Sequence, residues 1–205
     1  MPSDYLERFE KAVPADLQAA IALAILAAYR AAALWAQTEL RAFGWREALG
    51  TVRWFFLQEK LLELRDRYPA LETITMRNQA GTHVFGLAHA AEIYFTLSKV
   101  ERPDSKPAAA EFRRLLQSPV QLSWLEDWSV LPRDGIYALL IHGPNCADPS
   151  EPAFVQIKFM DGNDGYLPRF IDLYQRYLTA PSVERAEISR GPLVKARRHV
   201  EKKLG

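Results

Sequence analysis

Three polar residues in the second half of the chain have types that could perform phosphoryl chemistry. Gln156 and Lys158 lie in the apolar run at 153–160, and Asp148 lies in the Pro-, Asp- and Ser-rich segment before it. Because side chains alternate along a strand, we expect Gln156 and Lys158 to lie side by side on one face. A carboxylate and an amide oxygen can ligate Mg²⁺, and a nearby ammonium can orient a water and a phosphate.

The order of these residues resembles the motif of restriction-type nucleases: an acid, seven residues, then Gln, one residue and Lys. The resemblance implies a Mg²⁺-dependent nuclease in which Asp148, Gln156 and Lys158 are catalytic. A Gln in place of Glu removes a charge that Mg²⁺ would favour. The alternative interpretation is a solvent-facing Gln and Lys on an edge strand.

A second polar cluster is predicted at a hairpin turn. Arg77 and Asn78 end one predicted strand and His83 begins the next. Arg113 and Arg114, on the outer side of a short predicted helix, would join them if that helix packs beside the hairpin. Such a cluster could bind a phosphate or a carboxylate, which would suit a sensor of a small anionic ligand. The alternative is a turn with ordinary surface charge.

The C-terminal tail is basic. Between residues 190 and 203 six basic residues stand against one acid. The residues predicted to contact nucleic-acid phosphates are Lys195, Arg197, Arg198, Lys202 and Lys203. The alternative is a solvated end, and no aromatic residue is interleaved to stack on bases.

The remaining chemistry-bearing residues point to no cofactor. Cys146 is the single cysteine, which excludes an intramolecular disulfide and fits a reducing cytosol. His89 and His199 have no partners at ligand spacing, so no metal is expected apart from Mg²⁺ under the nuclease interpretation. His142 ends an apolar strand and is expected to be a core residue with one backbone hydrogen bond. The polar first residues do not form a signal peptide, so we expect a cytoplasmic protein.

The N-terminal third is predicted to be helical, at 3–12, from Pro14 to about 43, and at 51–68. Ten of the twenty residues at 17–36 are alanine. We reject a membrane span there because Arg30 would lie in its middle. The small residues favour a buried helix with close neighbours. The runner-up use of this surface is a homodimer interface or a protein-binding interface.

The rest of the chain is predicted to form a sheet. Strands are expected at 72–77, 82–88, 92–100, 136–143 and 153–160, with helices at 106–117 and 166–179. The first three strands read as an antiparallel meander. The strand at 136–143 is apolar on both faces, which favours a place inside the sheet.

Together these patterns predict an α+β fold in which a helical third packs on a mixed or antiparallel sheet of about five strands. We expect one compact domain with a helical region at 1–69, a sheet region at 70–188 and a basic tail at 189–205. No strong catalytic signature is present. The first function hypothesis is therefore a soluble accessory protein that binds a macromolecular partner or itself, possibly with nucleic acid. The enzyme alternative is the nuclease.

Overall fold

The computed structural model describes residues 5–40, 44–77, 84–108, 116, 135–161 and 165–179. Three helices come first: α1 (Tyr5–Ala12), α2 (Ala15–Glu39) and α3 (Trp45–Arg67). Six strands follow: β1 (Glu72–Arg77), β2 (Val84–Ala90), β3 (Ile93–Lys99), β4 (Ile136–Pro144), β5 (Pro152–Met160) and β6 (Tyr166–Asp172). The predicted α+β class is confirmed, with one strand more than expected.

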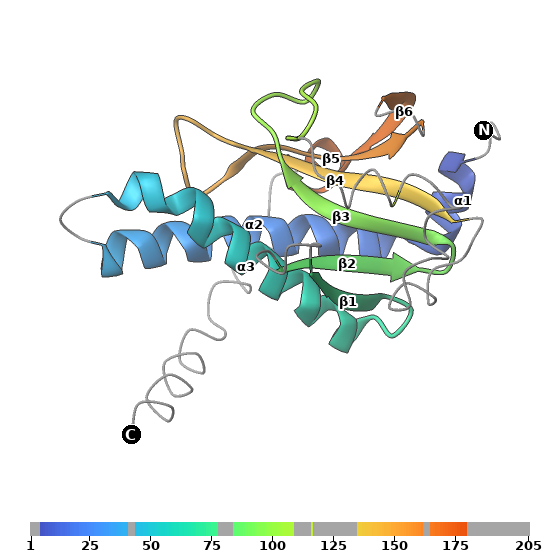
Figure 1. Cartoon of the computed structure of the whole chain (residues 1–205), viewed down its shortest axis with the longest axis horizontal. Helices are drawn as coiled ribbons and strands as arrows, with labels where there is room; N and C mark the ends of the chain where they lie inside the picture. Colours follow the sequence, from blue (N-terminus) through green and yellow to red (C-terminus); the bar gives the residue numbers. More distant parts are fainter. Residues whose placement is uncertain are drawn as a thin grey trace.

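The six strands form one sheet in the order in which they occur in the sequence (Figure 1). The pairs β1–β2 and β2–β3 are antiparallel, which confirms the predicted meander. The pairs β4–β5 and β5–β6 are antiparallel too, but β3 and β4 run parallel. A parallel pair requires a crossover rather than a hairpin, which is why the segment between β3 and β4 is long.

Strand β4 lies inside the sheet, as its apolar sequence predicts. Ala138 and Leu140 belong to the core beneath the helices. Tyr137, Leu139 and Ile141 belong to a second core on the opposite face. Successive side chains of β4 therefore enter two different apolar layers in turn, because both faces of the strand are buried.

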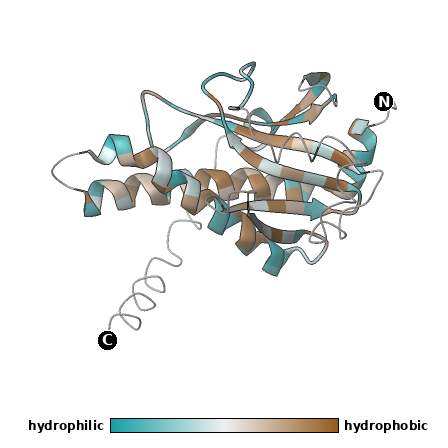
Figure 2. Ribbon diagram, in the orientation of Figure 1, coloured by the Kyte–Doolittle hydropathy of each residue, from teal (hydrophilic) through white to brown (hydrophobic). Residues whose placement is uncertain are grey.

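Helix α2 lies across one face of the sheet beside α3 (Figure 1). Its buried residues include Ala22, Ala28 and Ala32, which confirms the prediction of small residues packed against close neighbours. By length and composition α2 is apolar enough to cross a membrane, but half of that apolar window is buried in the protein. Figure 2 shows its apolar colour where it lies against the strands.

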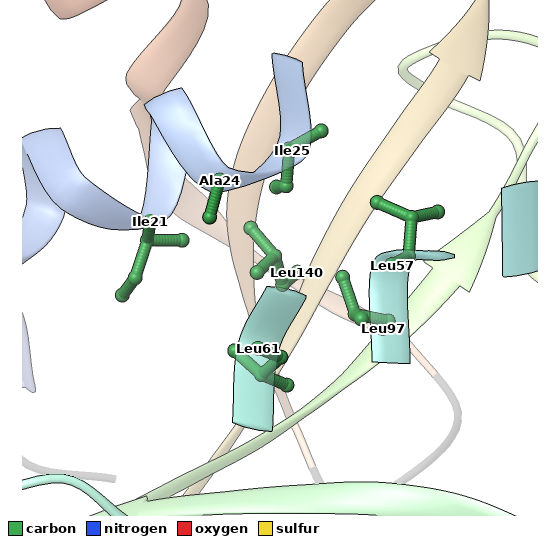
Figure 3. A pocket seen from close by; sticks show the side chains of 7 residues that line it. All are labelled: Ile21, Ala24, Ile25, Leu57, Leu61, Leu97 and Leu140. Carbon is green, nitrogen blue, oxygen red and sulfur yellow. The ribbon is translucent and has the colours of Figure 1, made fainter. Parts of the chain in front are cut away.

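The layer between α2, α3 and the sheet is dry and closely packed. Figure 3 shows seven apolar side chains around a space about the size of one water molecule. They are Ile21, Ala24, Ile25, Leu57, Leu61, Leu97 and Leu140. A lining of this kind offers no polar group to a ligand, so this space belongs to the core.

Toward the loop that joins them, α2 and α3 pack on each other. Their far ends share a separate small core made of Ala32, Ala33, Ala36 and Leu49, with no strand residue among its members. Before α3 the chain passes Gly44, whose φ of 82° is a conformation that glycine adopts without strain. The two helices therefore form a projecting hairpin, visible at the left of Figure 1.

The helix predicted at 166–179 is wrong. Residues 166–172 form the edge strand β6, and a π-helix follows at Tyr174–Leu178. Pro168 is compatible with the strand, because it lies where the register between β5 and β6 shifts, and proline is tolerated in edge strands and at bulges. Asp172 then begins the π-helix by accepting a hydrogen bond from the Gln175 amide at 2.9 Å. The apolar residues at 167–178 have helical spacing, although β6 ends and the π-helix begins within this range.

Other predicted boundaries differ by smaller amounts. Helix α3 begins six residues earlier than predicted, and the predicted start of β2 at residue 82 lies outside the described residues. Of the helix predicted at 106–117, residues 106–108 have no regular structure and Leu116 is helical. The rest of that segment lies outside the described residues.

Candidate functional site

Asp148 lies in the loop between β4 and β5, where it stabilises its own turn. Its carboxylate accepts hydrogen bonds from the Ser150 hydroxyl at 2.6 Å and the Ser150 amide at 2.8 Å. These donors hold the pKa of the Asp148 carboxyl below its usual value. Gln156 lies four residues into β5 from Pro152, about 13 Å along the strand. Among the described residues Asp148 has no hydrogen bond to Gln156 or Lys158, and the nuclease interpretation stays a prediction.

Gln156 and Lys158 do share a face, as predicted, but that face is buried. Each residue is 6% exposed. The acid beside them is Asp172, the cross-strand neighbour of Gln156 on β6. The Gln156 side-chain amide donates to the Asp172 carboxylate at 3.0 Å. Since β6 covers the edge, β5 is not the edge strand that the alternative interpretation assumed.

Lys158 is held between aromatic rings. Its ammonium lies 4.0 Å from the ring centroid of Phe170 and 5.5 Å from that of Tyr166. Burial lowers the pKa of Lys158, while the carboxylates of Asp104 and Asp172 act in the opposite direction. The charge is stabilised by ring quadrupoles and two nearby acids rather than by a direct ion pair.

We expect Lys158→Met to raise the free energy of unfolding at pH 7 by about 1 kcal/mol, because a buried charge is replaced by an apolar chain of similar length. The folded-state pKa of Lys158 lies below its unfolded value, so wild type gains stability as pH rises between the two values. The variant lacks that gain. Urea unfolding of both proteins between pH 7 and 10 measures the difference, and a constant difference across this range would contradict it.

The Asp172–Gln156–Lys158 group offers an acid, an amide and an amine, but little room for a metal. The side-chain oxygen of Gln156 is buried and has no hydrogen-bond partner. Within the described residues no group of three or more His, Cys, Asp or Glu side chains could hold a metal ion. The sequence pointed to Asp148 instead of Asp172 because residues 166–179 were read as a helix, which hides the cross-strand pairing.

Most of the other predicted site residues cannot be placed. Arg77 ends β1 and pairs with Val84 of β2. Its side chain lies outside the described residues, as do the partners proposed for it: Asn78, His83, Arg113 and Arg114. The basic tail residues Lys195, Arg197, Arg198, Lys202 and Lys203 lie outside them as well. Anion binding at the hairpin and nucleic-acid binding by the tail stay predictions.

One buried polar cluster escaped the sequence interpretation. The hydroxyl of Tyr29 lies 2.8 Å from Nδ1 of His142, and the Arg53 guanidinium lies over the Tyr29 ring at 4.6 Å. His142 is indeed buried, but its partner is this side chain of α2 rather than the expected backbone group. The available signal was the charged residue Arg53 directly before the apolar run at 54–57 of α3.

An apolar surface marks the helical hairpin. Among the described residues the exposed large hydrophobic side chains are Leu34 at 52%, Trp35 at 38%, Phe55 at 61% and Phe170 at 42%. Three of the four lie on α2 and α3, and we call Leu34, Trp35 and Phe55 the hairpin patch. Leu34 and Trp35 directly follow Ala32 and Ala33 on α2. These two alanines belong to the small core that α2 shares with α3. Leu34 and Trp35 therefore lie where the helices no longer rest on the sheet.

Comparison with known proteins identifies no relative: no family model, no curated protein and no solved structure matches this chain.

Proposed function

We propose that the protein is an interaction protein that self-associates through the hairpin patch. The observation that carries the proposal is the exposure of Leu34 and Trp35 near the far end of α2, with Phe55 exposed on the neighbouring helix α3. Scattered exposed apolar residues are ordinary, but exposed Trp and Phe on one projecting element are typical of a contact surface. Tryptophan is also among the residues that dominate the binding energy of protein interfaces.

A second copy of the chain is the partner that the charges favour. The formal net charge is +1, so two copies do not repel each other strongly. Both signs of charge surround the far end of the hairpin, with Glu39 on α2 and Arg46 and Glu47 on α3. A twofold interface places the same surface of both copies face to face. A surface whose edge carries both acidic and basic residues can therefore form ion pairs with the second copy. Two antiparallel hairpins would then form a four-helix arrangement.

The double change Trp35→Ser and Phe55→Ser is expected to weaken association at least thirtyfold, since loss of an interface hot spot costs about 2 kcal/mol or more. Size-exclusion chromatography with light scattering measures the mass between low and high micromolar concentration. Wild type is expected near twice 23.3 kDa and the variant near 23.3 kDa.

Phe170→Ser is the matched control, because it removes an exposed aromatic residue of β6, far along the chain from the hairpin. It is expected to keep the wild-type mass. A wild-type protein that stays monomeric at every concentration would overturn the proposal, as would a double variant that associates as wild type does.

A further inference from the structure

The carboxyl ends of β3 and β4 bring two cations together against α3. Lys99 ends β3 opposite His142 of the parallel neighbour β4. The Lys99 ammonium lies 3.8 Å from the position that a Cβ on Gly50 of α3 would occupy. Arg53 lies one turn further along α3 and faces Tyr29. One end of the sheet, one helix and two basic side chains therefore converge.

Arg53 is buried with its hydrogen-bonding capacity only partly used. The residue is 6% exposed, and burial lowers the pKa of its guanidinium. One terminal nitrogen donates to the backbone oxygen of Pro149 in the β4–β5 loop. The Nε atom is buried and has no hydrogen-bond partner. A guanidinium can donate five hydrogen bonds in a planar fork, so the contacts of the described residues leave this fork unsaturated.

No carboxylate compensates these charges among the described residues. The ion pairs there involve neither Arg53 nor Lys99. Glu151, the acid of the adjacent loop, pairs with Arg30 at 2.9 Å. Burial, together with the charges of Arg53 and Lys99, lowers the pKa of His142 to about 3, so the ring is neutral at pH 7. The cluster therefore carries two positive charges, and a buried charge without a counter-ion destabilises the fold.

The geometry points to a binding site for a phosphate group at Arg53 and Lys99, independent of the hairpin patch. Arg53 is the buried donor, and the exposed Lys99 is the point charge at the entrance. A guanidinium fork matches the geometry of phosphate oxygens, and a lysine adds charge without directional demands. Gly50 has no side chain, so the Lys99 ammonium can approach α3 closely at this position.

The experiment titrates the full-length protein with inorganic phosphate, with acetate and with chloride at equal ionic strength. Thermal unfolding and the NMR shift of the His142 ring proton are recorded together. Phosphate is expected to raise the melting temperature in a saturable way and to shift the His142 signal. Acetate and chloride are expected to do neither, because a planar carboxylate or a single ion cannot span both cations.

Two variants locate the site, and a third is the control. Arg53→Met and Lys99→Met are each expected to weaken phosphate binding about tenfold to hundredfold, as expected for a hydrogen bond to a charged group. Lys99 is exposed, so its variant reports binding even if Arg53→Met fails to fold. Arg169→Met removes an exposed cation of β6 and is expected to bind phosphate as wild type does.

Three results would overturn this assignment. The first is an equal response to phosphate, acetate and chloride at matched ionic strength, which indicates screening alone. The second is unchanged phosphate affinity in Lys99→Met. The third is an Arg53→Met protein that folds, binds phosphate with wild-type affinity, and loses the same amount of stability in the presence and absence of phosphate. Arg53 would then serve only to pack on Tyr29 and the β4–β5 loop.

Discussion

Replacing Phe159 with alanine is expected to lower the free energy of unfolding by about 3–5 kcal/mol. Phe159 is fully buried on β5, in the core beneath the helices. Its ring centroid lies 4.9 Å from that of Tyr5 and 5.5 Å from that of Phe9, both on α1. The change removes the contacts that dock α1 on the sheet and leaves a cavity. Urea unfolding followed by circular dichroism measures the loss.

Two further variants show whether cavity formation is the cause. Phe159→Leu keeps much of the side-chain volume and is expected to cost much less than the alanine change. Phe55→Ala removes the same ring from a position that is 61% exposed and is expected to change stability by less than about 0.5 kcal/mol. Equal losses at Phe159 and Phe55 would contradict the packing described here.

Acid is expected to destabilise the protein through His142. Burial, with Arg53 and Lys99, lowers the pKa of His142 to about 3, whereas the unfolded chain has the usual value of 6.5. Between these values the unfolded state binds a proton that the folded state does not, so stability falls as pH falls. From pH 7 to pH 5 the contribution of this group is a loss of about 2 kcal/mol.

The variant His142→Gln isolates this contribution, because glutamine can bond to Tyr29 but does not titrate. Unfolding free energies of both proteins are measured at pH 7, 6 and 5. The difference between them is expected to shrink by about 2 kcal/mol over that range. Tyr29→Phe keeps the buried ring of His142 and is expected to keep the pH dependence, since burial is the largest cause of the shift. Parallel pH curves for wild type and His142→Gln would refute the assignment.

Local patterns predicted the elements whose own residues determine them. The double-sided apolar run of β4 placed it inside the sheet, because a strand without a polar face must be covered twice. The alanines at 17–36 predicted a closely packed helix, since small side chains let backbones approach. Alternation on β5 correctly placed Gln156 and Lys158 on one face. The apolar spacing at 166–179 gave a wrong helix, because residues 166–172 pair with β5 instead.

By itself the sequence determined the α+β class, the two apolar faces of β4 and the shared face of Gln156 and Lys158. Only the tertiary structure decided which distant residues meet: Asp172 rather than Asp148 beside Gln156, and Tyr29, Arg53 and Lys99 around His142. The physical reason is that alternation and helical spacing act over a few residues. The partner of a side chain depends on strand order and register, and here the parallel pairing of β3 with β4 brings Lys99 beside His142.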